Sequence, residues 1–218
     1  MKYLKEFENE ADVKMGVLPN VVLANDTNKV LYNVEPIFVY IQHIDGRLIK
    51  PAQWEAEGIA SSEANGVAVV TDEAAFVVAK SRITSAFWST NQSTLIDGIL
   101  TTTDAAIAVT DYAGKSNTEL ATKSDKYGAF SSVAQWSMPN GQSCYIPALG
   151  ELNTALRFSE EIDNAMSIIG GTPLNFSGNT YWSSTQNSAE RAWIVQYGNI
   201  SYMSKGVSIS VRPFAPLE

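Results

Sequence analysis

Side chains that could perform catalysis or hold a metal are few in this chain and lie far apart. The single histidine, His43, falls in a β-rich run over residues 37–44, and the single cysteine, Cys144, is remote from it in sequence. A nucleophilic triad or a zinc site needs several such groups in one cluster, and one of each supplies neither. We therefore expect His43 to be structural and Cys144 to be a small buried side chain.

Paired carboxylates, which glycosidases use, occur at Asp72–Glu73 and Glu160–Glu161. Each pair begins a predicted helix, where the positive end of the helix dipole stabilises acidic residues. The string Gly114-Lys115-Ser116 lacks the first glycine of a phosphate-binding loop, and we interpret it as a turn before a helix. Gly170-Gly171 ends a predicted helix, whereas a phosphate cradle needs a helix start. We predict that the chain is not an enzyme and that it holds no cofactor and no metal.

The composition of the chain limits the classes of partner that it is expected to bind. The chain has 218 residues, of which 45% are apolar and 17% charged, and its net charge is −8. Nucleic-acid binders usually carry a basic stripe, so we expect no nucleic-acid partner. No apolar run approaches the roughly 20 residues that a membrane span needs, and the first residues contain no apolar core of signal-peptide length. We therefore expect no membrane insertion.

The predicted secondary structure, which must position any site, differs from one part of the chain to the next. Residues 1–35 predict a small N-terminal β-rich segment, with a short helix over Tyr3–Val13 and a hairpin made of Val21–Leu23 and Lys29–Tyr32. Residues 36–216 form the main domain. At its start we expect a strand over residues 37–44, a turn at Asp45-Gly46 and a second strand over Gly66–Val70.

Helices dominate the middle of the main domain. Thr71-Asp72-Glu73 resembles a helix start and predicts a short helix over Ala74–Arg82. Residues 99–109 are ambiguous between helix and strand. The spacing of apolar residues predicts helices over Glu119–Trp136, with a break near Tyr127-Gly128, over Leu149–Phe158, and from Ser159 to Gly170-Gly171.

The last part of the chain alternates with period two. Trp193, Val195 and Tyr197 alternate with Ile194 and Gln196, and short turns separate this run from residues 200–203 and 207–211. Such a pattern predicts an antiparallel meander with one buried face. The fold class is therefore α+β, with two main helices followed by a C-terminal antiparallel hairpin sheet.

An ordered set of short motifs runs through the same region. It comprises Asp111, Gly114-Lys115, Asn117-Thr118, Ile146-Pro147, Leu149–Leu152, Gly170–Pro173, Tyr181–Thr185, Ala192-Trp193, Val195, Lys205 and Val211–Pro213. Over residues 95–214 this set resembles a C-type-lectin-like family of gut Bacteroidales and their phages. The likeness implies a C-type-lectin-like fold, related to that of the formylglycine-generating enzyme but without its cysteine pair.

Several members of this family are variable proteins of diversity-generating retroelements, in which a fixed framework carries hypervariable positions that bind receptors. The resemblance implies a framework of Trp182, Ser183, Ser184, Trp193, Val195, Val211, Arg212 and Pro213, with Tyr181, Thr185, Ala192 and Lys205 beside them. It implies that the displayed, ligand-binding residues are Asn187, Ala189, Glu190, Arg191, Ile194, Gln196, Asn199, Ser201, Tyr202, Met203, Ser204, Gly206, Ser208 and Ser210.

The chain departs from the family at Gln186, where an acidic residue is usual, and the turn after Tyr197 is one residue shorter than in many relatives. The strings of calcium-dependent sugar lectins are absent. The resemblance implies a display protein that binds a protein or glycan receptor, on a virion or a bacterial cell surface. Two alternatives stay open: a structural or assembly protein of a phage particle or cell surface, with residues 1–90 mediating a homo-oligomer, and a carbohydrate-binding module.

Overall fold

The computed structural model describes residues 3–7, 30–34, 38–90, 93–123 and 128–217 of the chain. The chain divides into two compact units, Met1–Phe38 and Val39–Glu218. Each unit is described by itself below. In the described residues, no helix combines the length and the apolar character that crossing a membrane requires.

The first unit contains an antiparallel pair of strands, β1 (Tyr3–Phe7) and β2 (Val30–Val34). The helix predicted over Tyr3–Val13 is therefore wrong for residues 3–7, because pairing with a second strand overrides a weak local helix preference. The predicted strand at Lys29–Tyr32 overlaps β2, but its partner is β1. The other predicted strand, Val21–Leu23, lies outside the described residues.

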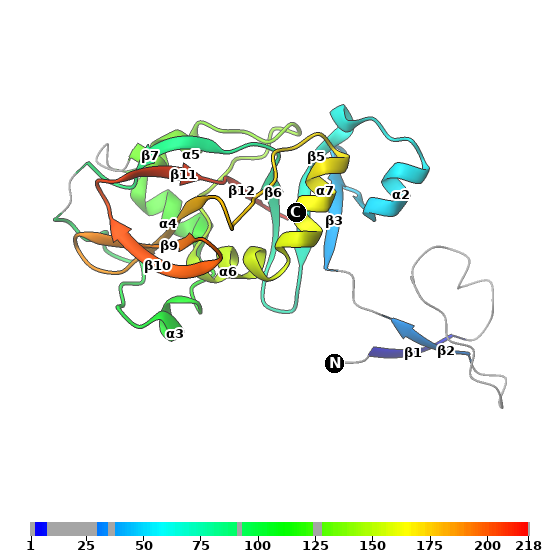
Figure 1. Ribbon diagram of the computed structural model, residues 1–218, viewed down its shortest axis with the longest axis horizontal. Coiled ribbons are helices and arrows are strands. Elements are labelled where there is room, and N and C mark those ends of the chain that lie inside the picture. The colour runs from blue at the N-terminus through cyan, green and yellow to red at the C-terminus, as the bar shows by residue number, and fades with distance from the viewer. Residues whose placement is uncertain (1–2, 8–29, 35–37, 91–92, 124–127, 218) are drawn as a thin grey trace. The chain divides into compact units, whose positions relative to one another are not determined.

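The second unit holds two five-stranded sheets (Figure 1). The first has the order β12-β6-β5-β3-β4 and is antiparallel throughout. Its strands are β3 (Val39–His43), β4 (Leu48–Ile49), β5 (Ala64–Val70), β6 (Ala75–Ala79) and β12 (Phe214–Pro216). The turn at Asp45-Gly46 joins β3 to β4 as predicted, and β5 covers the predicted strand at Gly66–Val70.

Strand β6 replaces the helix predicted over Ala74–Arg82. The Thr71 hydroxyl accepts hydrogen bonds from the backbone N–H groups of Glu73 (3.2 Å) and Ala74 (3.0 Å), so it closes a hairpin turn between β5 and β6 rather than a helix start. A threonine hydroxyl can accept these backbone hydrogen bonds both in a turn and at the start of a helix. Asp72 and Glu73 therefore lie in a turn, and no helix dipole accounts for them.

The second sheet has the order β10-β9-β8-β11-β7. Its strands are β7 (Ile83–Phe87), β8 (Thr180–Gln186), β9 (Arg191–Gln196), β10 (Asn199–Ser204) and β11 (Ser208–Val211). Strands β8, β9 and β10 form the predicted antiparallel meander. The meander does not continue to β11, which pairs in parallel with β8 and antiparallel with β7.

The described part of the chain contains six α-helices and the short 3₁₀ helix η1 (Ser61–Glu63). The α-helices are α2 (Pro51–Ala56), α3 (Ala105–Ala108), α4 (Gly114–Ala121), α5 (Gly128–Ala134), α6 (Leu149–Arg157) and α7 (Ser159–Ile168). The helices predicted at 149–158 and after Ser159 are confirmed. Instead of one interrupted helix over 119–136, α4 begins earlier, at Gly114, and α5 follows separately. The α+β class is confirmed.

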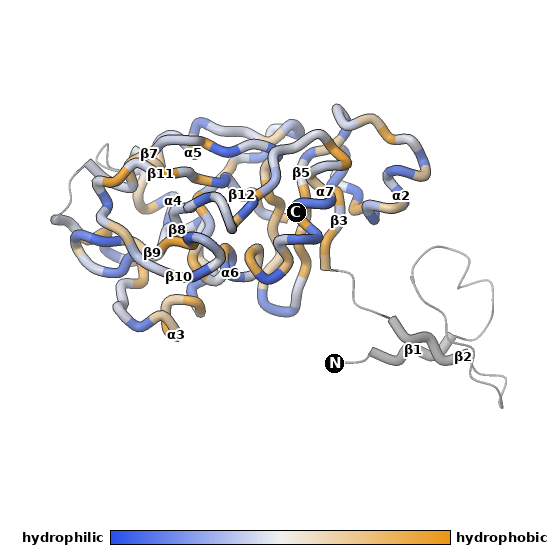
Figure 2. The backbone as a smooth tube through the Cα atoms, viewed as in Figure 1, coloured by the Kyte–Doolittle hydropathy of each residue, from blue (hydrophilic) through white to orange (hydrophobic). Residues whose placement is uncertain are grey.

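Two hydrophobic clusters form the core, and the sheets lie between them. Val67 and Val78 belong to one cluster, whereas Ala68 and Val77, their neighbours along β5 and β6, belong to the other. Helices α6 and α7 pack against β8, β9, β3 and β5, while α4 and α5 pack against β8 and β7 (Figure 1). Figure 2 shows β5 and β6 as hydrophobic segments and the β9–β10 turn as hydrophilic. Because a hydrophobic cluster lies on each side of the sheets, strands such as β5 and β6 are buried on both faces.

Candidate ligand-binding face

The framework residues are buried and use their polar atoms within the fold. Trp182 and Trp193 donate their indole N–H groups to the carbonyls of Ala86 (3.0 Å) and Thr102 (2.9 Å). The Ser183 hydroxyl donates to the Trp193 carbonyl at 2.8 Å. The whole framework set, including Val195, Val211, Arg212 and Pro213, is buried. These residues hold β8 and β9 in register and present nothing to a ligand.

A buried polar network ties the upstream motifs to β8. The Asp111 carboxylate accepts hydrogen bonds from the Asn117 amide (3.1 Å) and the Thr185 hydroxyl (2.8 Å). Asn117 also donates to the Ser184 hydroxyl (3.1 Å), and Thr185 accepts from the backbone N–H of Leu149 at 2.8 Å. The network therefore joins α4, the start of α6 and β8. Buried polar groups need such partners, which accounts for these residue types.

Glu151 extends this network at the start of α6. Its carboxylate accepts hydrogen bonds from the Ala148 backbone N–H (2.7 Å) and the Tyr145 hydroxyl (2.9 Å). A side chain at Gly114 would collide with the same carboxylate, so glycine is needed there. Burial and, to a smaller extent, the nearby Asp111 carboxylate raise the pKa of Glu151 to about 8, against hydrogen bonds that lower it. A raised carboxyl pKa has a structural cause here.

Lys205 is buried beside Gln186, the residue that departs from the family pattern. The Lys205 ammonium donates to the Gln186 side-chain carbonyl (3.0 Å) and the Thr94 carbonyl (3.1 Å), and it lies 4.3 Å from the centre of the Trp88 ring. Burial lowers the pKa of Lys205 to about 8. Gln186 also bonds both backbone groups of Ile96. The pair thus fixes the loop after β7, with an amide in place of a carboxylate.

The Arg212 side chain forms hydrogen bonds with the motif Gly170–Pro173. Its guanidinium donates to the carbonyls of Ala79 (2.9 Å), Thr172 (2.6 Å) and Pro173 (2.9 Å). Burial lowers the pKa of Arg212, although the nearby Tyr181 acts in the opposite direction. The side chain therefore joins the end of β6 to the loop after α7.

The predicted displayed residues differ in exposure. Ile194 and Asn187 were placed in that set wrongly: Ile194 is 0% exposed and Asn187 4%. Ile194 packs in the cluster that contains Trp182, because β9 is buried on both faces and alternation does not mark a solvent side. Of the others, five are exposed and seven half-buried; the exposed ones are Glu190, Arg191, Asn199, Tyr202 and Ser208, and the half-buried ones Ala189, Gln196, Ser201, Met203, Ser204, Gly206 and Ser210.

The structure divides these residues among separate places. Arg191 pairs with Ser204 and Trp193 with Tyr202, so these four share one face of the β9–β10 ladder. Gln196 and Ser201 belong to the opposite face by the same register. Strand β11, with Ser208 and Ser210, is separated from β10 by β9 and β8. The prediction that the displayed side chains form a single row is therefore wrong.

One group within the set is in mutual contact. The Arg191 guanidinium lies over the Tyr202 ring at 5.0 Å, and the rings of Tyr202 and Trp193 meet edge to face at 5.9 Å. Tyr202 is 47% exposed, whereas Trp193 is only 3% exposed. The arrangement presents a stacked cation and phenol on a buried anchor.

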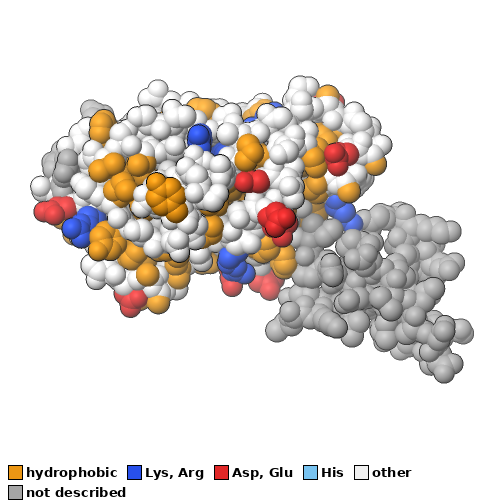
Figure 3. Space-filling model, viewed as in Figure 1, with side chains coloured by type: hydrophobic (Ala, Val, Ile, Leu, Met, Phe, Trp, Pro, Cys, Tyr) orange, Lys and Arg blue, Asp and Glu red, His pale blue; other side chains and the backbone are white. Residues whose placement is uncertain are grey.

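Three exposed hydrophobic residues near these strands were missed from the sequence. They are Phe87, which pairs with Ser208, Val207 in the β10–β11 turn, and Tyr197, whose φ is +48° in the β9–β10 turn. Figure 3 shows hydrophobic side chains gathering over the end of the second unit where β7, β10 and β11 lie. The segment Ile83–Phe87 has no clean alternation of apolar and polar residues, so no local pattern marks β7 or Phe87.

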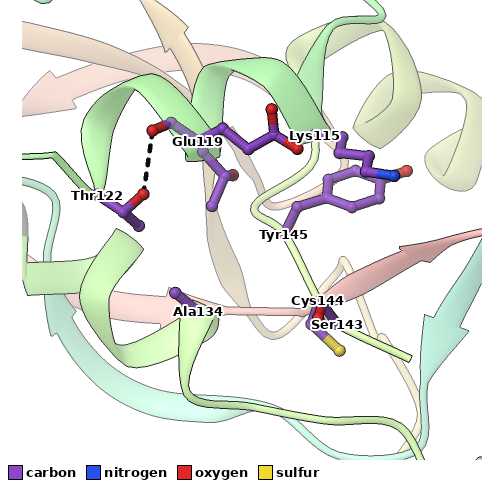
Figure 4. A pocket seen from close by; sticks show the side chains of 8 residues that line it. Lys115, Glu119, Thr122, Ala134, Ser143, Cys144 and Tyr145 are labelled. Atoms are coloured by element: carbon purple, nitrogen blue, oxygen red, sulfur yellow. Dashed lines mark hydrogen bonds between the residues drawn. The ribbon is translucent and has the colours of Figure 1, made fainter. Parts of the chain in front are cut away.

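The remaining candidates for chemistry lie elsewhere. A cavity of about 260 Å³ lies between α4, α5 and residues 143–145, with Lys115 and Glu119 along one side and Cys144 on another (Figure 4). Burial raises the pKa of the Cys144 thiol to about 12, which disfavours the reactive thiolate. His43 contacts the carboxylates of Asp45 (2.9 Å) and Glu63 (3.0 Å). In the described ranges no group of three or more His, Cys, Asp or Glu residues could hold a metal ion.

Comparison with known proteins adds one likeness. No protein-family model matches the chain, and no curated protein matches it. The chain is similar in structure to a fimbrial protein from Bacteroides ovatus. The match has a TM-score of 0.55 and 15% sequence identity, and covers 83% of this chain and 48% of that one. The likeness shows a shared fold, and the chain spans about half the length of the fimbrial protein.

Proposed function

We propose that this protein is a non-enzymatic structural or adhesive protein of the bacterial cell surface, of the fimbrial kind. The observation that carries the proposal is the fold shared with a Bacteroides fimbrial protein over 83% of the chain. The buried polar residues support the non-enzymatic part, because Asp111, Glu151 and Lys205 each have structural partners. We favour the bacterial cell surface over a virion as the location, because the similar structure is a bacterial fimbrial protein.

Antibodies raised against the purified chain test this proposal on the organism that carries the gene. Immunogold electron microscopy of intact cells should place the label on the outer surface or on filaments. Pre-adsorbing the serum with the chain should remove the label. A label that appears only after the cells are permeabilised would contradict the proposal.

A second function, ligand display on a C-type-lectin-like framework, is favoured by a specific observation. The motif residues Asp111, Asn117, Ser184 and Thr185 form one connected buried network. The β9–β10 ladder, by contrast, carries exposed side chains at Arg191, Asn199 and Tyr202. A fixed framework beside replaceable surface positions is what binding by a variable protein requires, and a protein or glycan receptor would be the partner.

The coding DNA tests this second function at little cost. A diversity-generating cassette should contain an imperfect repeat of the region encoding residues 181–213, with differences confined to template adenines. These differences should fall on codons of exposed residues such as Tyr202 and spare those of buried residues such as Trp182. If no such repeat is found, the diversified display function is contradicted, and the proposed surface function is unaffected.

A further inference from the structure

Two arginines of the second unit stack on exposed or half-buried aromatic rings, and they differ in one respect. Arg157 lies over the Phe158 ring at 5.6 Å, and its guanidinium also bonds the Glu73 carboxylate at 3.3 Å. Arg191 lies over the Tyr202 ring at 5.0 Å, and within the described ranges no carboxylate lies within salt-bridge distance of it. Arg157 therefore has its anion within the chain, and Arg191 has none among the residues that the structure describes.

The aromatic neighbours of Arg191 favour one placement of its guanidinium in the absence of a ligand. Trp193 is anchored by its indole bond to Thr102, and the Tyr202 ring meets that anchored ring edge to face. Arg191 in turn lies over Tyr202. Stacking occupies the flat face of a guanidinium and leaves the N–H groups in its plane free to donate. A preordered cation loses less conformational entropy when it binds an anion.

From this arrangement we propose that Arg191 and Tyr202 bind a carboxylated sugar, such as a sialic or uronic acid at the end of a glycan. The guanidinium would receive the carboxylate through two parallel hydrogen bonds. The Tyr202 hydroxyl, which has no hydrogen-bond partner in the described part of the chain, would bond a ring hydroxyl. This inference rests on the ligand-display function proposed above and names its ligand class.

Charge favours a sugar over an acidic peptide at this place. The chain has a net charge of −8, and Glu190, next to Arg191, is itself exposed. A ligand with several carboxylates would be repelled by this field, whereas a sugar ring carries one carboxylate within a compact group of hydroxyls. A single fixed guanidinium beside a phenol matches that pattern.

Calorimetric titration of the full chain tests the inference with paired probes. The probes are 6′-sialyllactose against lactose, a glucuronic-acid-terminated disaccharide against its glucose-terminated counterpart, and an acidic hexapeptide. One carboxylated sugar should bind at least about tenfold more tightly than its neutral partner, as a charge-assisted bidentate contact would give. The two sugar arms separate sialic from uronic acid.

The variants make the test specific to Arg191. Arg191→Gln should abolish the preference for the carboxylated sugar, and Arg191→Lys should lose most of it, because lysine keeps the charge but not the two-pronged geometry. Tyr202→Leu should weaken binding by a smaller factor. The matched control is Arg157→Gln, which removes the other stacked arginine and should leave the dissociation constant unchanged. Thermal melting establishes that each variant is folded.

Several outcomes would overturn the inference. They are equal binding of charged and neutral sugars, full binding by folded Arg191→Gln, binding of the hexapeptide alone, and absence of binding to every probe. In these cases an imperfect repeat of the region encoding residues 181–213 would still support ligand display, with a ligand of another class, and a surface label on intact cells would still support the surface function. A label confined to permeabilised cells would instead remove the proposed surface role, whatever the titrations show.

Discussion

Strands β8 and β10 belong to the same sheet and are separated only by β9, yet their side chains have opposite roles. On β8, Ser183, Ser184 and Thr185 are fully buried, and each side chain has a specific hydrogen-bond partner. On β10, an edge strand, Asn199 and Tyr202 are exposed. Position within the sheet, more than residue type, separates framework from surface, since serines occur in both strands.

This contrast has a consequence for change in sequence. A buried hydroxyl bonded to a carboxylate or a carbonyl cannot be replaced without leaving its partner unsatisfied, which costs about 1–3 kcal/mol. An exposed side chain on an edge strand leaves no such partner behind. The fold therefore permits variation on β10 and resists it on β8, whether or not the gene is actually diversified.

The largest expected effect is at the tryptophan of β8. Trp182→Ala should lower the free energy of unfolding by about 3–5 kcal/mol, because it empties a large core site, and it also leaves the Ala86 carbonyl without its donor. Urea denaturation followed by circular dichroism measures the change. Tyr202→Ala on β10 is the control and should cost far less. Equal losses would erase the distinction between the two strands.

A matched pair of directly opposed residues sharpens the comparison. Ile194 on β9 faces Ser201 on β10 across the ladder, and Ile194 is fully buried. Ile194→Ala should cost about 2–5 kcal/mol, as loss of a buried branched side chain usually does. The same denaturation experiment measures it. A loss below that of a typical surface substitution would mean that Ile194 is displayed after all, as the sequence first indicated.

The buried ionisable groups predict how stability depends on pH. The pKa of Glu151 is raised from the usual glutamate value of 4.5 to about 8. Between these two values the folded state binds more protons than the unfolded state, so stability falls as pH rises through this range. The pKa of Lys205 is lowered from 10.5 to about 8, so its charging penalty disappears as pH rises from 8 towards 10.5. The pKa of Cys144 is raised from 9.0 to about 12, which lowers stability as pH rises above 9 and opposes the Lys205 effect there. The groups together therefore favour a stability minimum near pH 8, with a rise confined to about pH 8–9.

Denaturation at several pH values in matched variants tests each limb. Glu151→Gln should flatten the decline between pH 5 and 8, by at most about 1.4 kcal/mol per pH unit for one group. Lys205→Met should flatten the rise above pH 8. Arg47→Gln, at an exposed ion pair with Asp45, is the control and should preserve both limbs. An unchanged profile in Glu151→Gln would show that another group carries the decline.

The sequence predicted α6 and α7 correctly, but it placed helices where β1 and β6 lie and misjudged the faces of β9. Helices α6 and α7 follow from apolar spacing and from the glycines that end α7, which are local signals. Strand β6 was missed because Thr71 makes the same local hydrogen bonds in a turn as at a helix start. The burial of Ile194 depends on a second cluster packed behind β9, which no local pattern reveals.

The smallest expected effects are at exposed or half-buried polar positions of β10 and β11. Ser201→Ala on β10 and Ser208→Ala on β11 should each change the free energy of unfolding by no more than about 0.5 kcal/mol, as exposed or half-exposed sites usually do. Ser184→Ala on β8 is the informative control, since it deprives Asn117 of a buried partner. Because all three changes remove only a hydroxyl, any difference in melting temperature among them measures position in the sheet. A Ser208 variant as unstable as the Ser184 variant would place Ser208 with the framework, beside Val211 of the same strand, and confine the replaceable surface to the β9–β10 ladder.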